Sequence, residues 1–227
     1  MPIPATHTTQ SDNADLQLCK QWLLLNKPFA KNKNQGSDAP NSVDYTRRQA
    51  AILLAAPHAV RHERNGKIKG ADKRTGGLVK LLSQQTDTSS LVTSGYVQKW
   101  QSWSERNDDF RTILEQEILE GSLVLDIHGM SDSHHIDICL GLGARPSIRM
   151  LEAAHYIQAT LRAYSVAINK PFAAIGSRTV RSYAQYLGGD AIQIEIAAHL
   201  RDAVDNTSEA AAFARSLSKI IRQLATT

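Results

Sequence analysis

The sequence predicts an α/β fold in which a mostly parallel sheet is covered by helices on both faces. Short apolar runs alternate with amphipathic helical patterns from Arg48 onward, which is typical of strands joined by crossover helices. Hydrophobic residues make up 42% and charged residues 21% of the 227 residues, as in ordinary globular proteins that bury a core. We interpret this stretch as one domain.

The predicted strands are short runs rich in β-branched and apolar residues. They cover residues 51–56, 90–93, 123–127, 135–140, 165–168 and 191–196. The last run alternates strictly, so its three isoleucines share one side of the strand while Gln193 and Glu195 share the other.

The predicted helices follow a spacing of three and four between apolar residues. They cover residues 72–84, 109–120 and 148–164, and a last helix begins near Asn206. Gly121 is well placed to end the second of these helices. Asn206 and Glu209 have the spacing of a capping box at the start of the last one.

The first 47 residues are expected to form an N-terminal segment and loop that is partly disordered, followed by a folded domain over residues 48–227. Residues 1–14 are polar and should be poorly ordered. Residues 16–25 are predicted to form a short helix, and residues 31–42 a loop rich in Asn, Lys, Gly and Pro.

Composition also excludes several classes of protein. The two cysteines, Cys19 and Cys139, are far apart, which argues against a disulfide framework and a cysteine-rich zinc site. We expect no membrane span, because the longest apolar run is residues 50–57, and no targeting signal. A cytoplasmic location follows from these features.

The net charge of +4 permits an anionic partner without requiring one. The densest basic group comprises Lys67, Lys69, Lys73 and Arg74. We interpret it as a solvated loop and helix start, not as a nucleic-acid surface, because no aromatic residues or known binding motif accompany it.

Two histidines directly follow predicted strands: His58 comes after residues 51–56 and Pro57, and His128 after residues 123–127. The carboxyl ends of strands are the ligand-binding edge of open α/β sheets, so the two side chains can converge there. A catalytic zinc usually takes three protein ligands and keeps one open position. With two histidines as ligands, we expect a carboxylate as the third ligand.

Asp72 and Glu63 both lie after His58 and are alternatives for that carboxylate. Asp72 opens a predicted helix, which would fix its position, although a plain helix N-cap also explains an aspartate there. Glu63 lies in a polar turn. His62 is four residues from His58, but the surrounding Pro57 and Gly66 favour a loop over a helical metal-binding pair.

Two further aspartates, Asp126 and Asp137, are candidates for orienting a metal-binding imidazole, as carboxylates often do. Glu195 is the most informative acidic residue, because a sheet covered on both faces leaves its side chain no solvent. Either a buried ion pair with Arg178 or Arg181 accounts for it, or a role as general base.

Four motifs occur in order: Pro57-His58, Asp72-x-x-Thr75-Gly76, Asp126-Ile127-His128-Gly129 and Gln193-Ile194-Glu195-Ile196. Together they resemble the N-formylglutamate amidohydrolase family, which is related to zinc carboxypeptidases and aminoacylases. The similarity runs from about residue 51 to residue 201 and includes Asn169-Lys170-Pro171-Phe172.

The resemblance implies a phosphorylase/hydrolase-like fold, a three-layer α/β/α sandwich around a mixed sheet. It implies that His58, Asp72 and His128 bind one Zn²⁺ and that Glu195 is the general base and acid. The expected reaction is hydrolysis of an amide bond in an N-acylated amino acid similar to N-formylglutamate. A zinc peptidase or γ-glutamyl hydrolase is the alternative within the enzymes, and a non-catalytic binding protein the alternative outside them.

The sequence departs from the family at two points. The basic stretch 61–70 separates His58 from Asp72, which keeps Glu63 open as the acidic ligand. No clear Asn-Arg pair is present for a substrate carboxylate, so Arg178, Arg181 and Arg145 are the candidates for that contact. The expected partner is a small molecule or peptide that carries a carboxylate.

Overall fold

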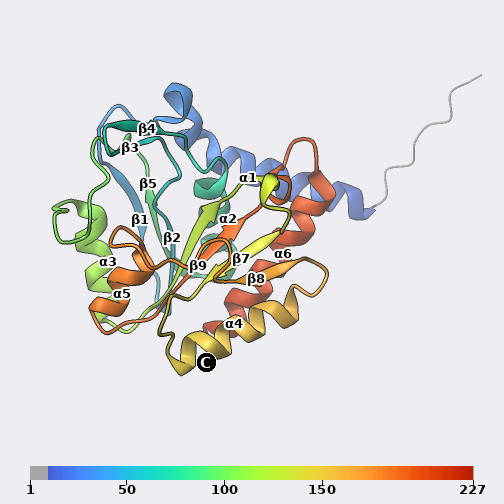
Figure 1. The fold of residues 1–227 in the computed structure, drawn as a ribbon. Helices are drawn as coiled ribbons and strands as arrows, with labels where there is room; N and C mark the ends of the chain where they lie inside the picture. The colour runs from blue at the N-terminus through green and yellow to red at the C-terminus, as the bar shows by residue number, and fades with distance from the viewer. Residues whose placement is uncertain (1–9, 227) are drawn as a thin grey trace, which may run out of the picture.

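The computed structural model describes residues 10–226. A mixed seven-stranded sheet runs through the centre of the molecule in the order β1-β5-β2-β6-β9-β7-β8 (Figure 1). Its strands are β1 (Val43–Thr46), β2 (Ala50–Ala56), β5 (Thr88–Thr93), β6 (Leu123–Gly129), β7 (Ile138–Gly141), β8 (Val166–Ile168) and β9 (Ala191–Ile196). The four strands β5, β2, β6 and β9 are parallel, whereas β1 and β7 run antiparallel to their neighbours β5 and β9.

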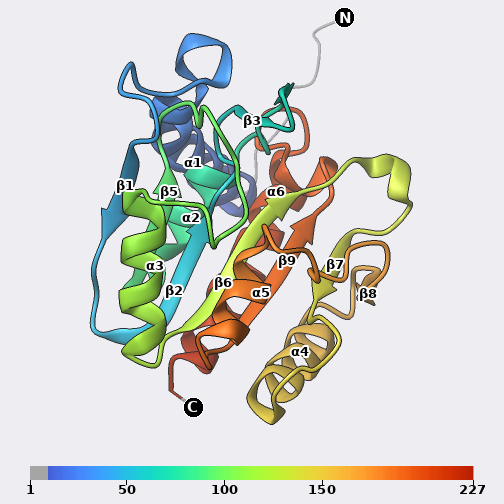
Figure 2. The same ribbon diagram turned by 60° about the vertical axis from the view of Figure 1, so that its left-hand side comes forward.

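Helices cover both faces of the sheet (Figure 2). They are α1 (Gln10–Asn34), α2 (Thr75–Thr86), α3 (Asp109–Leu119), α4 (Ile148–Thr160), α5 (Val180–Tyr186) and α6 (Thr207–Leu224). The larger apolar core joins α1, α2, α4 and α6 to one face of the sheet, and the smaller core joins α3 and α5 to the other. The three-layer α/β/α architecture expected from the sequence is confirmed.

Alternation along each strand determines which core it supplies. In β2, Ile52 and Leu54 pack into the larger core and Leu53 into the smaller one. In β9 the isoleucines face the larger core, as predicted. This orientation turns Gln193 and Glu195 to the opposite side of the sheet, where they line a cavity.

The N-terminal segment packs against the rest of the chain. Helix α1 contacts α2 and α6, and Trp22 is completely buried, with its indole N–H donating to the carbonyl of Arg74 at 2.9 Å. Residues 10–14, expected to be poorly ordered, are helical, while residues 1–9 lie outside the described part of the chain. The predicted loop agrees with the backbone from Lys31 to Lys33, which leaves the helical conformation.

Three local predictions are wrong. The strand expected over residues 135–140 begins only at Ile138, because His135 ends a short 3-10 turn with φ of 55°. The helix expected from Asp72 begins at Thr75. The Asn206 side chain does not cap the backbone of α6; its amide donates to the Glu209 carboxylate instead.

The polar stretch after His58 forms a β-hairpin made of β3 (His62–Arg64) and β4 (Lys67–Lys69). Asn65 and Gly66 turn the chain with φ of 55° and 67°, the left-handed conformation that asparagine and glycine adopt most readily in two-residue hairpin loops. Figure 2 shows this hairpin above the carboxyl ends of the parallel strands.

Both cysteines are free and buried. Within residues 10–226, no helix combines the length and apolar character that crossing a membrane requires.

Candidate metal centre and its cavity

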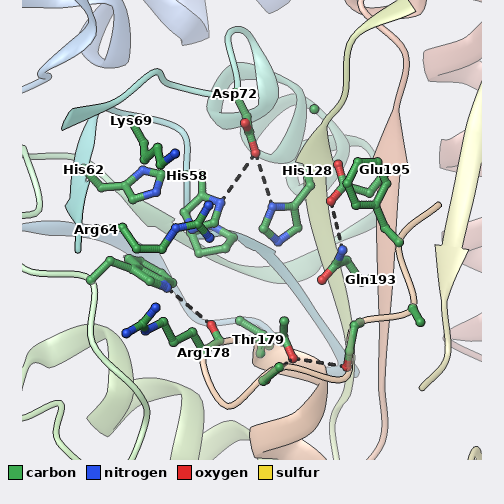
Figure 3. Close-up of a pocket in the computed structure, with 18 of the residues that line it drawn as sticks. His58, His62, Arg64, Lys69, Asp72, His128, Arg178, Thr179, Gln193 and Glu195 are labelled. Atoms are coloured by element: carbon green, nitrogen blue, oxygen red, sulfur yellow. Dashed lines mark hydrogen bonds and ion pairs between the residues drawn. The ribbon is translucent and has the colours of Figure 1, made fainter. Parts of the chain in front are cut away.

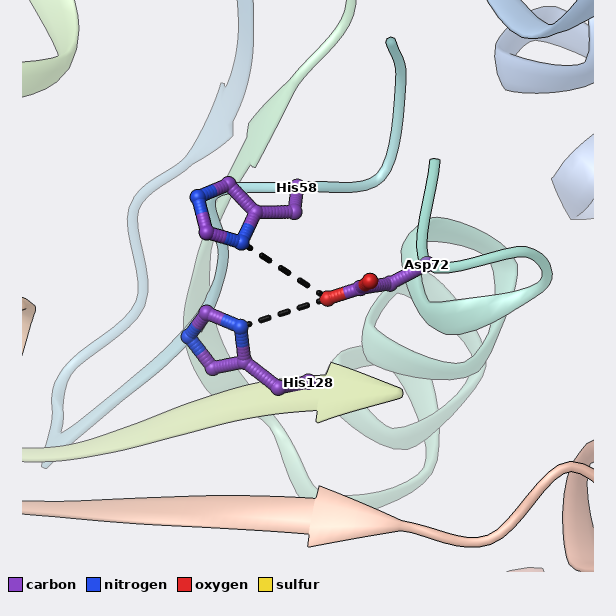
Figure 4. A group of neighbouring side chains, drawn as sticks. All are labelled: His58, Asp72 and His128. Carbon is purple, nitrogen blue, oxygen red and sulfur yellow. Dashed lines mark hydrogen bonds and ion pairs between the residues drawn. The ribbon is translucent and has the colours of Figure 1, made fainter. Parts of the chain in front are cut away.

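Three side chains that are distant in sequence meet at the carboxyl end of the sheet (Figure 4). His58, Asp72 and His128 each offer a ligand atom, and these atoms all lie within 4.8 Å of one another. The Asp72 Oδ2 atom is 3.2 Å from His128 Nδ1 and 3.7 Å from His58 Nδ1. Two imidazoles and a carboxylate form the type of ligand set that catalytic zinc sites use.

Main-chain contacts fix the position of Asp72. Its N–H donates to the carbonyl of His58 at 2.8 Å, and its own carbonyl accepts from the N–H and the hydroxyl of Thr75. Helix α2 begins after this turn and has no side-chain cap. The Asp72 carboxylate therefore does not cap the helix and is directed at the two histidines.

His128 is oriented by a buried carboxylate. Asp126 lies two residues earlier in β6, on the same face, and its Oδ2 is 3.0 Å from His128 Nε2. This contact leaves Nδ1 as the nitrogen facing the cluster, in the way that outer carboxylates orient metal-binding histidines. Of the two aspartates considered from the sequence, Asp126 has this contact, whereas Asp137 bonds to Ser165 and His199.

The electrostatics of the cluster favour a bound cation. Burial opposes ionisation of Asp72, but hydrogen bonds from His128 and His58 outweigh it and hold the Asp72 pKa well below its usual range. Burial lowers the pKa of His58. Burial also disfavours charge on His128, yet Asp126 and Asp72 raise its pKa well above the ordinary value. The buried carboxylate of Asp126 and the half-buried one of Asp72 both favour positive charge here, and a divalent metal fits the residues present.

The other acidic candidate, Glu63, is not part of this cluster. Glu63 pairs with Ile68 across the hairpin, on the face opposite to that of His62, and it borders a separate hollow beside Lys99 and Glu105. Glu63 is therefore too far from the cluster to be its third member. Asp72 is the carboxylate that meets the two histidines.

Glu195 lies beside the cluster. It pairs in register with His128 across the parallel β6–β9 ladder, is 8% exposed, and accepts a hydrogen bond from Gln193 Nε2 at 2.9 Å. Burial raises the Glu195 pKa to about 7. No ion pair to Glu195 occurs among residues 10–226, so the proposed ion pair with Arg178 or Arg181 is not observed.

Arg201 ties the carboxyl ends of several elements together. Its buried guanidinium donates to the carbonyls of Ile196 and Met130 at 3.0 and 3.1 Å, and also to that of Lys73. Gly129 makes room for it, because a Cβ there would lie 2.5 Å from the guanidinium carbon. The glycine that follows His128 is therefore explained by the close approach of Arg201. No motif or spacing in the sequence indicates this role of Arg201.

The cluster and Glu195 line a cavity of about 490 Å³ (Figure 3), within the size range of small-molecule sites. Of the three arginines considered from the sequence, Arg178 lines this cavity. The other two arginine candidates do not: Arg181 donates to Gln185 and to the carbonyl of Arg145, and the Arg145 side chain is exposed outside the lining.

The sequence did not single out several other residues of the lining, among them Arg64 and Lys69 of the hairpin, and Trp100. His62 also lines the cavity and stacks on His58 with ring centroids 4.2 Å apart. Burial lowers the His62 pKa to about 3, so its ring is neutral at pH 7. Neither of its nitrogens has a hydrogen-bond partner within residues 10–226.

The sequence matches no protein-family model, and a comparison with curated proteins finds no match. Several solved structures are similar to this protein in fold. A bacteriophage poly-gamma-glutamate hydrolase has a TM-score of 0.55 at 16% identity, over 88% of this chain and 95% of that one. N-formylglutamate amidohydrolase from Ralstonia eutropha JMP134 has a TM-score of 0.56 at 13% identity, over 82% and 98%.

Gene product Atu2144 from Agrobacterium tumefaciens is also similar, with a TM-score of 0.52 at 16% identity, over 82% of this chain and 95% of that one. Each likeness spans nearly the whole of the neighbouring chain. Together they confirm the fold that the family resemblance implied.

Proposed function

We propose that this protein is a zinc-dependent hydrolase of amide bonds. The observation that carries the proposal is the meeting of His58, Asp72 and His128 at one end of a cavity, with the buried carboxylate of Glu195 beside them. The names of two similar structures, a poly-gamma-glutamate hydrolase and an N-formylglutamate amidohydrolase, support the choice of amides as substrates.

His58, Asp72 and His128 would hold the zinc, with Asp126 behind His128. When bound by these residues, zinc would supply a Lewis acid that could polarise the scissile carbonyl and lower the pKa of water. Three protein ligands are the number typical of catalytic zinc sites, whereas structural zinc sites use four.

Glu195 acts as the proton carrier. Its carboxylate takes a proton from the attacking water as the C–O bond forms, and it returns a proton to the leaving nitrogen as the C–N bond breaks. Gln193 restrains the carboxylate through the hydrogen bond to Oε1. In the metal-free protein burial raises the Glu195 pKa to about 7, and a raised pKa favours uptake of a proton by the carboxylate.

Arg178 binds a carboxylate of the substrate. Its guanidinium borders the cavity, and its Nε is buried without a partner among the described residues. A guanidinium and a carboxylate can form two parallel hydrogen bonds, so this contact would orient an N-acylated amino acid.

Zinc analysis combined with a substrate screen tests the proposal. Purified protein should contain about one zinc per chain and hydrolyse a member of a panel of N-acyl amino acids and γ-glutamyl peptides, and chelation should abolish the hydrolysis. Activity on γ-glutamyl peptides alone would favour the γ-glutamyl hydrolase alternative. Protein that binds no added zinc and cleaves none of the panel would instead be a non-catalytic binding protein.

A further inference from the structure

The Gln193 side chain presents an unpaired oxygen to the cavity. Gln193 is 5% exposed and lines the cavity. Its Nε2 donates to Glu195 Oε1 at 2.9 Å, whereas no residue among 10–226 donates a hydrogen bond to its Oε1. A buried amide oxygen without a donor is unfavourable, so the donor for this atom must come from whatever occupies the cavity.

Glu195 determines which end of the Gln193 amide faces the cavity. An ionised carboxylate can only accept hydrogen bonds, so the amide group must turn its NH₂ toward Glu195. The oxygen of the same amide is then directed away from Glu195. Figure 3 shows the Gln193 nitrogen toward Glu195 and the oxygen on the side of the open cavity. The contact that restrains Glu195 therefore also directs a free acceptor into the cavity.

Close packing holds the aliphatic part of Gln193. Gly141 lies opposite Gln193 in the antiparallel pair of β7 and β9. A Cβ on Gly141 would lie 2.9 Å from the Cβ of Ala174 and 3.2 Å from the Cβ of Gln193. Because Gly141 has no side chain, the segment that contains Ala174 can pass close to β9 beside Gln193. This packing restricts the Gln193 side chain and reduces the entropy cost of binding a ligand through its amide.

The strand register places the free oxygen beside the proton carrier. Gln193 and Glu195 are two residues apart in β9 and face the same side, and Glu195 is in register with His128 of the metal-ligand cluster. A group that receives a proton from Glu195 therefore lies within reach of the hydrogen-bonded Gln193 amide as well. In the proposed reaction, that group is the leaving nitrogen.

The leaving nitrogen of a secondary amide offers two different contacts. It carries one N–H, and after water has added to the carbonyl carbon it also carries a lone pair that points in another direction. If the N–H donates to Gln193 Oε1, the lone pair stays free for the proton held by Glu195. As the C–N bond breaks, that proton moves from Glu195 to the lone pair, while the N–H bond remains intact. Gln193 then orients the nitrogen and transfers no proton.

We propose that Gln193 Oε1 accepts the N–H of the scissile bond, so that the enzyme selects secondary amides over esters and tertiary amides. This inference rests on the proposed amide hydrolysis and assigns the contact that recognises the leaving nitrogen. An ester or a tertiary amide has no hydrogen at that atom and leaves Oε1 without a donor. In an ester, the leaving oxygen would also place a second acceptor against Oε1.

Two phosphorus compounds test the inference, because a tetrahedral phosphonyl group imitates the carbon to which water has added. They are N-(methylphosphonyl)glutamate and its ester analogue, in which an oxygen atom replaces the N–H. The two probes are otherwise identical. Their dissociation constants are measured by calorimetry with zinc present. Wild-type protein is assayed in parallel for hydrolysis of N-acetylglutamate, the corresponding amide.

Wild type should bind the N–H probe about ten- to a hundredfold more tightly than the ester probe. Gln193→Met removes the amide oxygen and keeps the length of the side chain, so the ratio of the two affinities should fall to about one. The same variant loses the hydrogen bond to Glu195, but that loss affects both probes alike and does not change the ratio. Gln98→Met is the control, because Gln98 is exposed and does not line the cavity. It should keep the ratio of wild type.

Equal binding of the two probes to wild type, or binding of neither, would overturn the inference, and this measurement does not depend on the folding of any variant. A preference that survives in Gln193→Met, or is lost equally in Gln98→Met, would overturn it too. The hydrolase proposal fails separately. If the predicted binding pattern holds and wild type cleaves neither N-acetylglutamate nor any other amide tested, that proposal is wrong. Cleavage of N-acetylglutamate without the binding preference contradicts only the role of Gln193.

Discussion

Replacing Glu195 by glutamine tests the environment and the role of this residue together. Burial raises the Glu195 pKa from 4.5 to about 7 in the metal-free protein, so the folded state binds this proton more tightly than the unfolded state does. Below pH 4.5 the carboxyl group is mostly protonated in both states, so its burial does not lower the free energy of unfolding. As the pH rises toward 7, the unfolded chain ionises first and the free energy of unfolding falls.

The pKa shift of Glu195 lowers the free energy of unfolding by about 3 kcal/mol at pH 8, and by less than about 1 kcal/mol at pH 5. The neutral amide avoids this cost and can still accept the hydrogen bond from Gln193. Metal-free Glu195→Gln should therefore be more stable than wild type by about 3 kcal/mol at pH 8 and by much less at pH 5. Urea denaturation of chelator-treated protein at the two pH values measures the difference.

Glu152→Gln is the control, because Glu152 is an exposed glutamate on α4 and its replacement should change stability by no more than about 0.5 kcal/mol. In the zinc-loaded protein, Glu195→Gln should keep its metal and lose roughly 10²–10⁴-fold in kcat. A gain in stability independent of pH would refute the account of the buried charge, and near-normal turnover would refute the role of Glu195 in proton transfer.

Three other predictions concern the metal-ligand cluster and its support. Elemental analysis should show that His58→Ala and His128→Ala each lose most bound zinc. The control His155→Ala, at an exposed histidine, should keep its zinc. Full zinc occupancy in both His58→Ala and His128→Ala would disprove the site. Asp126 and Asp72 outweigh the effect of burial and raise the pKa of His128, so zinc must displace a proton from His128 and the affinity for zinc should rise with pH up to that pKa. Calorimetry in buffers of different ionisation enthalpy should detect the released proton. If no proton is released, His128 is neutral in the metal-free protein. Gly129→Ala would place a methyl group 2.5 Å from the Arg201 guanidinium and should destabilise the protein by about 1–3 kcal/mol, as seen in its urea midpoint; an unchanged midpoint would mean that Arg201 moves freely.

The sequence was most informative where local periodicity and topology constrain a side chain together. Strict alternation in the last strand placed Glu195 opposite three isoleucines, and the structure gives it that orientation. Histidines at the carboxyl ends of two predicted strands were expected to converge. The structure places His58 two residues after β2 and His128 next to the last residue of β6, and the two side chains do meet. Both predictions follow from backbone geometry, which the local sequence controls.

Features that depend on contacts between distant segments were not predicted. Residues 62–66 were interpreted as a polar turn, and Lys69 was assigned to a solvated loop because no aromatic residues or known binding motif accompany the basic group. The structure instead holds Glu63 by backbone hydrogen bonds to Val97 and Trp100, more than thirty residues away, and Arg64 and Lys69 line the cavity. Which of the three candidate arginines lines the cavity also depends on a distant contact, namely where α5 packs against the sheet.

The most direct test of the account is to locate the metal. A zinc-soaked crystal measured at the zinc absorption edge should give one strong anomalous peak, at about 2.0–2.2 Å from the Nδ1 atoms of His58 and His128 and from the Asp72 carboxylate. Asp72→Ala should remove this peak and Glu63→Ala should leave it in place. A peak at Glu63, or one that survives in Asp72→Ala, would contradict the assignment of the cluster as the metal centre.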